Sequence, residues 1–205
     1  SNFMETDWMF AAGAKDEGIP IAFVVNEEGR LAWIGYPEYL RRVLHKILNN
    51  TWNIKDALDK RISDKNLAEL DDSLNFDLMK YRGDQNDPNN ISEPDSALYV
   101  INKITQKEPR LKYAPLISFN TFMALLKTNP HNAYEFGKQV IVTPTYDDPA
   151  YDMIIDVIQL DSGKSKFPTE VYELGAKAYQ LKINHVFYPK IANMPKYYHD
   201  MAAWY

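Results

Sequence analysis

The residue types that most often carry out chemistry in proteins are sparse in this chain. It has no cysteine, so it offers no thiolate nucleophile, no disulfide and no sulfur ligand for zinc. Its four histidines show no spacing such as His-x-x-x-His that would bring two rings to one metal ion; they are His45, His131, His185 and His199. We therefore predict no catalytic residue, no metal site and no cofactor in these 205 residues.

Two pairs of adjacent carboxylates, Asp71-Asp72 and Asp147-Asp148, could in principle hold a cation or act as an acid-base pair. Neighbouring side chains on a helix point in different directions, and acids in a turn more often cap helices. We predict structural roles for both pairs. The tripeptide Arg82-Gly83-Asp84 matches the motif that integrins bind, but a glycine directly after a helix is also an ordinary helix stop.

The N-terminal part of the chain predicts a β-hairpin. Two runs rich in β-branched and aromatic residues, 18–25 and 30–37, flank a turn that contains Gly29, which can take the positive φ that such a turn needs. A helix with one buried face should follow, because apolar residues recur there at helical spacing: Leu40, Val43, Leu44, Ile47 and Leu48.

Residues 3–58 resemble the C-terminal half of a thioredoxin fold, and most of all the bacterial TlpA-like thiol-disulfide oxidoreductases. The matching segments are Trp8-Met9, Ala11-Ala12-Gly13, Gly18-Ile19-Pro20, Ala22-Phe23-Val24-Val25, Gly29, Ala32-Trp33-Ile34-Gly35 and Trp52. In that family the bond before this proline is cis and its loop receives the extended substrate chain. The resemblance thus implies that Ile19 and Pro20 are substrate-binding residues.

The chain departs from the family pattern in three ways. Ile21 stands where the family usually has threonine, and Tyr36 stands where it usually has histidine. The Cys-x-x-Cys part of the family fold would precede Ser1. Thiol-disulfide exchange needs sulfur, so the resemblance predicts a fragment of an oxidoreductase that is catalytically inactive as it stands.

Composition excludes several other classes of function. A net charge of -5 without a basic stripe argues against nucleic acid as a partner. No run of eighteen apolar residues is present, so we predict no membrane span. A periplasmic location, or an extracytoplasmic one attached to the membrane, is implied only by the resemblance.

Beyond residue 58 the pattern becomes helical. Leu67, Leu70, Leu74 and Leu78 predict a helix over 64–81, behind Ser63-Asp64 as cap residues. The polar segment 82–95 predicts a loop, with a capping box at Ser92 and Asp95 for the next helix. That helix should carry Ala97, Leu98, Ile101 and Ile104 on one face.

A weak internal repeat follows. Pro130, Pro149 and Pro168 stand nineteen residues apart, and each is expected to open a helix, as are Pro115 and Pro195. A helix and a turn every nineteen residues make a two-helix unit of about 38, close to helical hairpins of the tetratricopeptide kind. Gly137 and Gly175 would let neighbouring helices approach closely.

The predicted fold class is therefore α+β: a partial thioredoxin-like fold at 1–58, with an antiparallel hairpin and flanking helices, and a mostly α-helical domain of irregular helical hairpins at 59–205. Two functions fit this organisation. One is a fragment of a thioredoxin-like thiol-disulfide oxidoreductase, whose partners would be protein thiols and disulfides. The other is a non-catalytic protein-interaction scaffold. Because the hairpin lacks the strand that would flank it in a whole thioredoxin, we also expect a homodimer or a strand-swapped oligomer.

Overall fold

The computed structural model describes residues 9–14, 20–82, 91–146, 149–161 and 167–185. The chain forms two compact units, Ser1–Arg61 and Ile62–Tyr205, and the boundary between them lies within one long helix, α3 (Ile54–Leu78). One small antiparallel sheet is present in the part described, and most of the remainder is helical, which confirms the α+β class.

The predicted hairpin is confirmed. Strand β1 (Ala22–Val25) pairs antiparallel with β2 (Leu31–Gly35), with Phe23 opposite Ile34 and Val24 opposite Trp33. Gly29 has a φ of 75°, as the turn requires. The Asn26 side-chain oxygen accepts hydrogen bonds from the backbone N–H groups of Glu28 and Arg30, which fixes the turn from its first residue.

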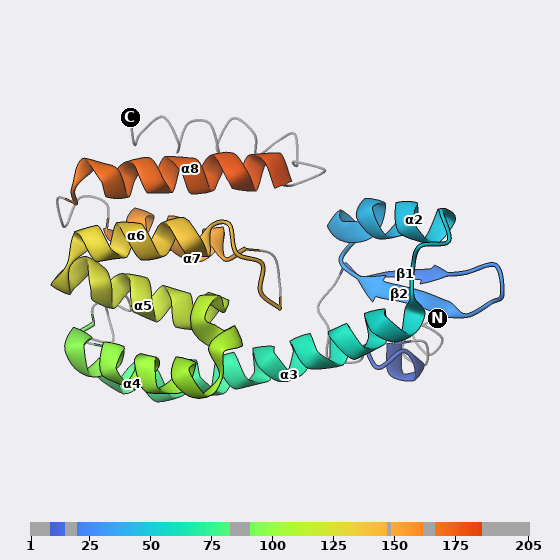
Figure 1. The fold of residues 1–205 in the computed structure, drawn as a ribbon, viewed down its shortest axis with the longest axis horizontal. Helices are drawn as coiled ribbons and strands as arrows, with labels where there is room; N and C mark the ends of the chain where they lie inside the picture. The colour runs from blue at the N-terminus through green and yellow to red at the C-terminus, as the bar shows by residue number, and fades with distance from the viewer. Residues whose placement is uncertain (1–8, 15–19, 83–90, 147–148, 162–166, 186–205) are drawn as a thin grey trace. The chain divides into compact units, whose positions relative to one another are not determined.

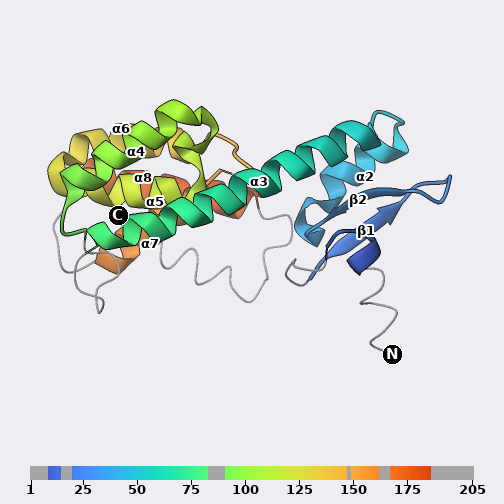
Figure 2. The same ribbon diagram turned by 90° about the horizontal axis from the view of Figure 1, so that it is seen from below.

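A 3₁₀ turn, η1 (Pro37–Tyr39), leads into helix α2 (Leu40–Leu48), which lies along one face of the sheet (Figure 1 and Figure 2). The predicted helix is present, but its expected buried face is narrower than predicted. Val43 is buried, whereas Leu44 is 37% exposed and Leu48 is 73% exposed. The reason is the width of the sheet, because two strands span only about 5 Å between their axes and cover little of a helix.

Helix α2 ends in a Schellman motif. Thr51 N–H donates to the Lys46 carbonyl and Asn50 N–H donates to the Ile47 carbonyl, with Asn50 in the left-handed region at φ 54°. The chain then returns to the sheet, where the Trp52 indole N–H donates to the Ala32 carbonyl at 2.8 Å. This bond joins the segment after α2 to strand β2.

The predicted start of the next helix at residue 64 is wrong. Helix α3 begins at Ile54, because the Asn53 side-chain oxygen accepts from the backbone N–H groups of Lys55 and Asp56 and caps the helix there. Ser63 and Asp64 lie inside the helix. The helical path continues through the 3₁₀ turn η2 (Met79–Tyr81), which agrees with the predicted end.

The predicted loop at 82–95 lies partly outside the described residues. Its two ends are joined, since Arg82 and Ile91 form an antiparallel β-bridge and both Ser92 N–H and Glu93 N–H donate to the Tyr81 carbonyl. The predicted capping box is wrong. The next helix starts at Pro94, so Glu93 is its cap residue, and the Ser92 hydroxyl donates to the Tyr81 carbonyl instead.

In its described residues, the second unit continues with one 3₁₀ helix and five α-helices. Three of the α-helices start at a proline, as predicted for Pro115 and Pro130, whereas α7 and α8 begin two residues after Pro149 and one residue after Pro168. Pro195 lies outside the described residues. The elements are α4 (Pro94–Lys107), η3 (Pro109–Tyr113), α5 (Pro115–Thr128), α6 (Pro130–Val140), α7 (Tyr151–Asp161) and α8 (Thr169–His185).

Helices α5 to α8 form two stacked hairpins. Helix α5 packs on α6 and α7 packs on α8, while α5 also packs on α7 and α6 on α8 (Figure 1). Contacts between α6 and α8 join residues 37 to 39 positions apart, with His131 bonded to Glu170 and the Gly137 backbone against Leu174. This spacing matches the predicted unit of about 38 residues.

Two apolar clusters hold this unit together. The larger one lies among α4 to α8 and includes Phe122, Ile154, Ile158 and Leu174. The smaller one joins α3 to α4, η3 and the start of α5; its buried members are Leu67, Leu78, Ile101, Leu111, Ala114 and Ile117, and the predicted face residue Ile104 packs against it. No helix in the described ranges is long and apolar enough to cross a membrane.

Candidate functional site

The two residues that the family resemblance implies for substrate binding lie before strand β1. Pro20 is exposed and lies at a bend two residues before that strand. Ile19, and with it the peptide bond between the two residues, is outside the described part of the chain. Their role in binding substrate therefore stays a prediction.

The most developed polar site surrounds Asp71, on the inner face of α3. Its side chain has no exposed surface, and both carboxylate oxygens accept hydrogen bonds. Leu116 N–H donates to Oδ2 at 2.9 Å, Ile117 N–H donates to Oδ1 at 3.0 Å, and the Tyr146 hydroxyl donates to Oδ2 at 2.8 Å. Asp72 is exposed, so the two adjacent acids point in different directions as predicted.

The local sequence of α5 explains why Asp71 is held there. The first N–H groups of a helix have no partner within the helix, and Ala114, at the cap position of α5, provides no side-chain oxygen. Pro115 occupies the first position and has no N–H, which leaves the N–H groups of Leu116 and Ile117 as the donors to satisfy. Asp71 satisfies both of them from another helix, and its negative charge lies at the positive end of the α5 dipole.

Burial raises the pKa of Asp71 above its ordinary value of 3.8, because removing the carboxylate from water costs more than its hydrogen bonds return. The bonds from Leu116, Tyr146 and Ile117 all act in the opposite direction, and the nearby charge of Asp72 raises the pKa slightly further. A buried carboxyl with three donors and a raised pKa can titrate closer to neutral pH than a surface aspartate.

A second polar cluster lies one helical turn along α3. Arg82 Nη2 donates to Asn75 Oδ1 at 2.9 Å and to Asn120 Oδ1 at 3.2 Å, and Asn120 Nδ2 donates to Asn75 Oδ1 at 2.9 Å. The guanidinium carbon also lies over the face of Phe119, 5.4 Å from the ring centre. Burial lowers the pKa of Arg82, and its Nε has no hydrogen-bond partner among the described residues.

These contacts decide between the two interpretations of Arg82-Gly83-Asp84. An adhesion motif must offer its arginine to a receptor, but this guanidinium is half-buried and bonded to Asn75 and Asn120. Gly83 and Asp84 lie outside the described residues. The arginine serves to attach the end of η2 to helix α5.

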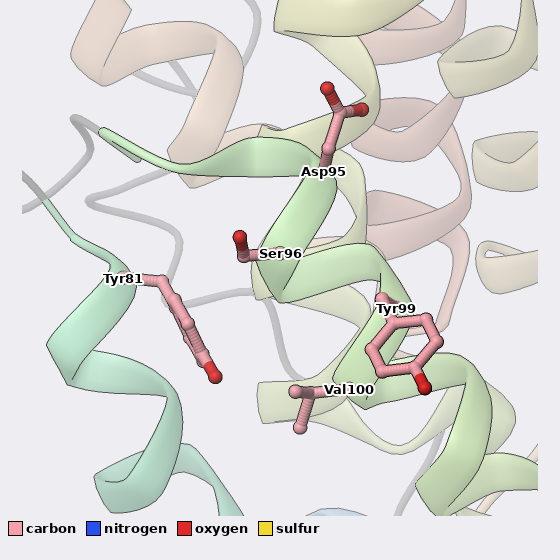
Figure 3. Close-up of a pocket in the computed structure, with 5 residues that line it drawn as sticks. All are labelled: Tyr81, Asp95, Ser96, Tyr99 and Val100. Atoms are coloured by element: carbon pink, nitrogen blue, oxygen red, sulfur yellow. The ribbon is translucent and has the colours of Figure 1, made fainter.

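A shallow surface depression of about 450 Å³ lies between η2 and the first turns of α4. Figure 3 shows Tyr81, Ser96 and Val100 extending into it from the two elements, with Asp95 and Tyr99 along its rim. Lys103 lies 4.4 Å from the Tyr99 ring centre. The described residues that line the depression include one carboxylate, Asp95, and no histidine.

The histidines that the structure describes make single surface contacts. His131 is bonded to Glu170 at 3.3 Å, and the His45 ring is bonded to Asn49 at 3.1 Å. His199 and the side chain of His185 lie outside the described set. Among the described residues, no group of three or more histidine, aspartate or glutamate side chains could hold a metal ion.

Sequence reasoning missed Asn75, Asn120 and Tyr146. One signal could have indicated part of the site, because Asp71 and Asn75 interrupt the leucine face of α3 at helical spacing from Leu67 and Leu78. A polar residue on a buried face needs a partner. Which partners it has depends on packing between residues about 45 positions apart, and local pattern does not contain that information.

The chain was also compared with known proteins. Searches against protein-family models, curated protein sequences and solved structures found no match.

Proposed function

We propose that the first unit is the C-terminal half of a thioredoxin-like domain, belonging to a thiol-disulfide oxidoreductase. The observation that carries this proposal is the order of its elements: Pro20, the antiparallel hairpin of β1 and β2, and then helix α2 packed on β2. This is the order that the resemblance implies for that half of the fold. The bond from Trp52 to Ala32, two of the matching positions, gives the segment after α2 a fixed place on the sheet.

In this proposal the 205 residues supply shape and substrate contact but not the reactive sulfur. Thiolate chemistry needs cysteine, and this chain has none. The exchanging thiols would come from polypeptide outside these residues, and Ile19 and Pro20 would lie against the substrate chain. The partners would be protein thiols and disulfides in the periplasm or at another extracytoplasmic site.

The test begins with the gene that encodes the chain. We expect a Cys-x-x-Cys motif about sixty to ninety codons before Ser1. The native protein that contains it should reduce insulin disulfides in the presence of a thiol donor, and a double Cys→Ser variant should be inactive. Absence of the motif, or activity that survives in the double variant, would reject the proposal.

The stacked hairpins of α5 to α8 favour a second candidate, a non-catalytic protein-interaction scaffold. Helical hairpins that stack at a constant offset form extended surfaces for partner binding, and the offset of 37 to 39 residues is observed here. The candidate predicts that peptides selected against the full chain share one sequence pattern and shift amide resonances of α5 to α8. Selected peptides without a common pattern would count against it.

A further inference from the structure

Helix α3 carries an outer apolar face as well as the inner face that packs on the smaller cluster. The inner face contributes Leu67 and Leu78 to that cluster. On the outer face, Ile62 is 52% exposed and Phe76 is 75% exposed, the largest exposed fraction among the large apolar side chains described. We propose that this outer face is a docking site for the same face of a second copy of the chain, with the two α3 helices antiparallel.

The outer face is a line of five exposed residues, which we name the α3 seam: Ile62, Lys65, Glu69, Asp72 and Phe76. They follow one another at steps of three, four, three and four residues, the spacing of the core positions in a coiled coil. Apolar residues stand at both ends of the seam and charged residues stand in its middle. A face with this spacing packs along the length of another helix, so we expect a helix as the occupant.

The order of the residues favours a second copy as that helix. In a two-fold antiparallel pair centred on Glu69, Ile62 of each copy meets Phe76 of the other, and Lys65 of each copy meets Asp72 of the other. In a parallel pair, each of the three charged residues would face its own copy, which gives three layers of like charge. The antiparallel pair has two layers of opposite charge and a single layer of like charge, at Glu69.

The contact is separate from the one expected through the hairpin, because all five residues of the α3 seam belong to the second unit. It is also small. The seam covers only fifteen residues, and its central layer is repulsive, so it buries less surface than a standard protein interface of about 1,600 Å². We therefore expect a weak contact that forms at roughly 100 µM chain and is rare at low micromolar concentrations.

Disulfide cross-linking tests this geometry directly, since the chain has no cysteine of its own. Full-length Lys65→Cys and Asp72→Cys chains are mixed at about 100 µM, oxidised mildly and analysed by intact mass, which distinguishes the three possible disulfides. In the antiparallel pair the two sites face each other, whereas like sites lie about 10 Å or more apart, beyond the reach of a disulfide. We expect the mixed disulfide to exceed each like pair at least about fivefold.

Gln106→Cys, at an exposed position on α4, measures cross-linking by random collision. A statistical mixture of the three disulfides, an excess of the like pairs, or a yield no higher than that of Gln106→Cys overturns the proposal.

A gain of affinity provides a second test that does not depend on cysteine variants. Glu69→Leu replaces the repulsive central layer with an apolar one, so we expect self-association of the full chain in sedimentation equilibrium to strengthen about tenfold. Glu135→Leu, the same change at an exposed position on α6, is the matched control and should have little effect. The proposal is rejected if the two variants associate equally.

Discussion

Asp71 shows how a helix can be capped by a residue that is distant in sequence. Helix α6 uses its own Asn129, whose side-chain oxygen accepts from Asn132 N–H at 3.1 Å. Helix α5 has Ala114 at the same position and takes its acceptor from α3 instead. The hydrogen bonds to Asp71 offset only part of the free energy that burying its carboxylate costs, as the raised pKa shows. The carboxylate contributes to the fold by pairing N–H donors that would otherwise be left without an acceptor.

The raised pKa has a definite consequence for stability. Above the folded-state pKa the carboxylate is charged in both the folded and unfolded chain, and burial then costs free energy. Below 3.8, its ordinary value, it is neutral in both states. The free energy of unfolding of wild type relative to Asp71→Asn should therefore fall as pH rises from 3.8 through the folded-state pKa.

Urea unfolding of the two proteins at closely spaced pH values measures this difference. The same comparison with Asp72→Asn should show a much smaller trend, because Asp72 is exposed. If the free energy of unfolding of wild type, relative to that of Asp71→Asn, instead rises with pH through this range, burial is not the dominant cause of the pKa shift.

At the scale of the helix, the Asn129 cap can be tested on its own. Asn129→Ala removes the acceptor for Asn132 N–H and should lower the free energy of unfolding by about 1 kcal/mol. Asn132→Ala is a matched control, because its exposed side chain is three residues further on and the change keeps the N–H group. We expect that control to stay within about 0.5 kcal/mol of wild type in urea unfolding.

The contact between α6 and α8 depends on Gly137. A Cβ atom at this position would lie 2.4 Å from Leu174 Cδ2 and 3.1 Å from Phe122 Cε2, so the Leu174 side chain would have to move. Gly137→Ala should therefore destabilise the second unit by about 1–3 kcal/mol.

A double-mutant cycle with Leu174→Ala separates this clash from a general effect on the helix. In the Leu174→Ala background the added methyl group has room, and Gly137→Ala should cost less or become stabilising. Equal costs in the two backgrounds, measured by urea unfolding, would show that Leu174 does not limit the approach.

Local sequence pattern predicted the elements better than their ends. Apolar alternation and Gly29 indicated the hairpin, and prolines marked the starts of α5 and α6, because these features act within a few residues. The start of α3 was misplaced by ten residues, since Asn53 is a cap residue as good as Ser63 and no break separates them. The hydrogen-bond partners of Asp71 could not be predicted, because they come together only in the packed unit.

At the scale of the molecule, the offset between the two hairpins was predictable from the spacing of the prolines, even though α7 and α8 begin after theirs. The thioredoxin-like identity of the first unit stays a prediction. A hairpin of two strands is compatible with many folds, and the strands that would distinguish them are not among the residues described.

The same hairpin carries the prediction of self-association. Both strands are apolar on both faces, a pattern typical of strands that are covered on two sides, and a two-stranded sheet is marginal alone. We expect sedimentation equilibrium to show a dimer of the full chain. Val25→Lys, at a position that is 46% exposed in β1, should shift the equilibrium toward monomer, and Val142→Lys, at a similarly exposed site in the second unit, should not. A strict monomer would contradict this expectation.

The distribution of tryptophans gives each unit its own optical signal. Trp8, Trp33 and Trp52 all belong to the first unit, and the remaining tryptophan is Trp204. In a Trp204→Phe chain, tryptophan emission would come from the first unit alone, while far-ultraviolet circular dichroism would follow mainly the helices of the second. The order in which the two units melt could then be measured in one sample without any added label.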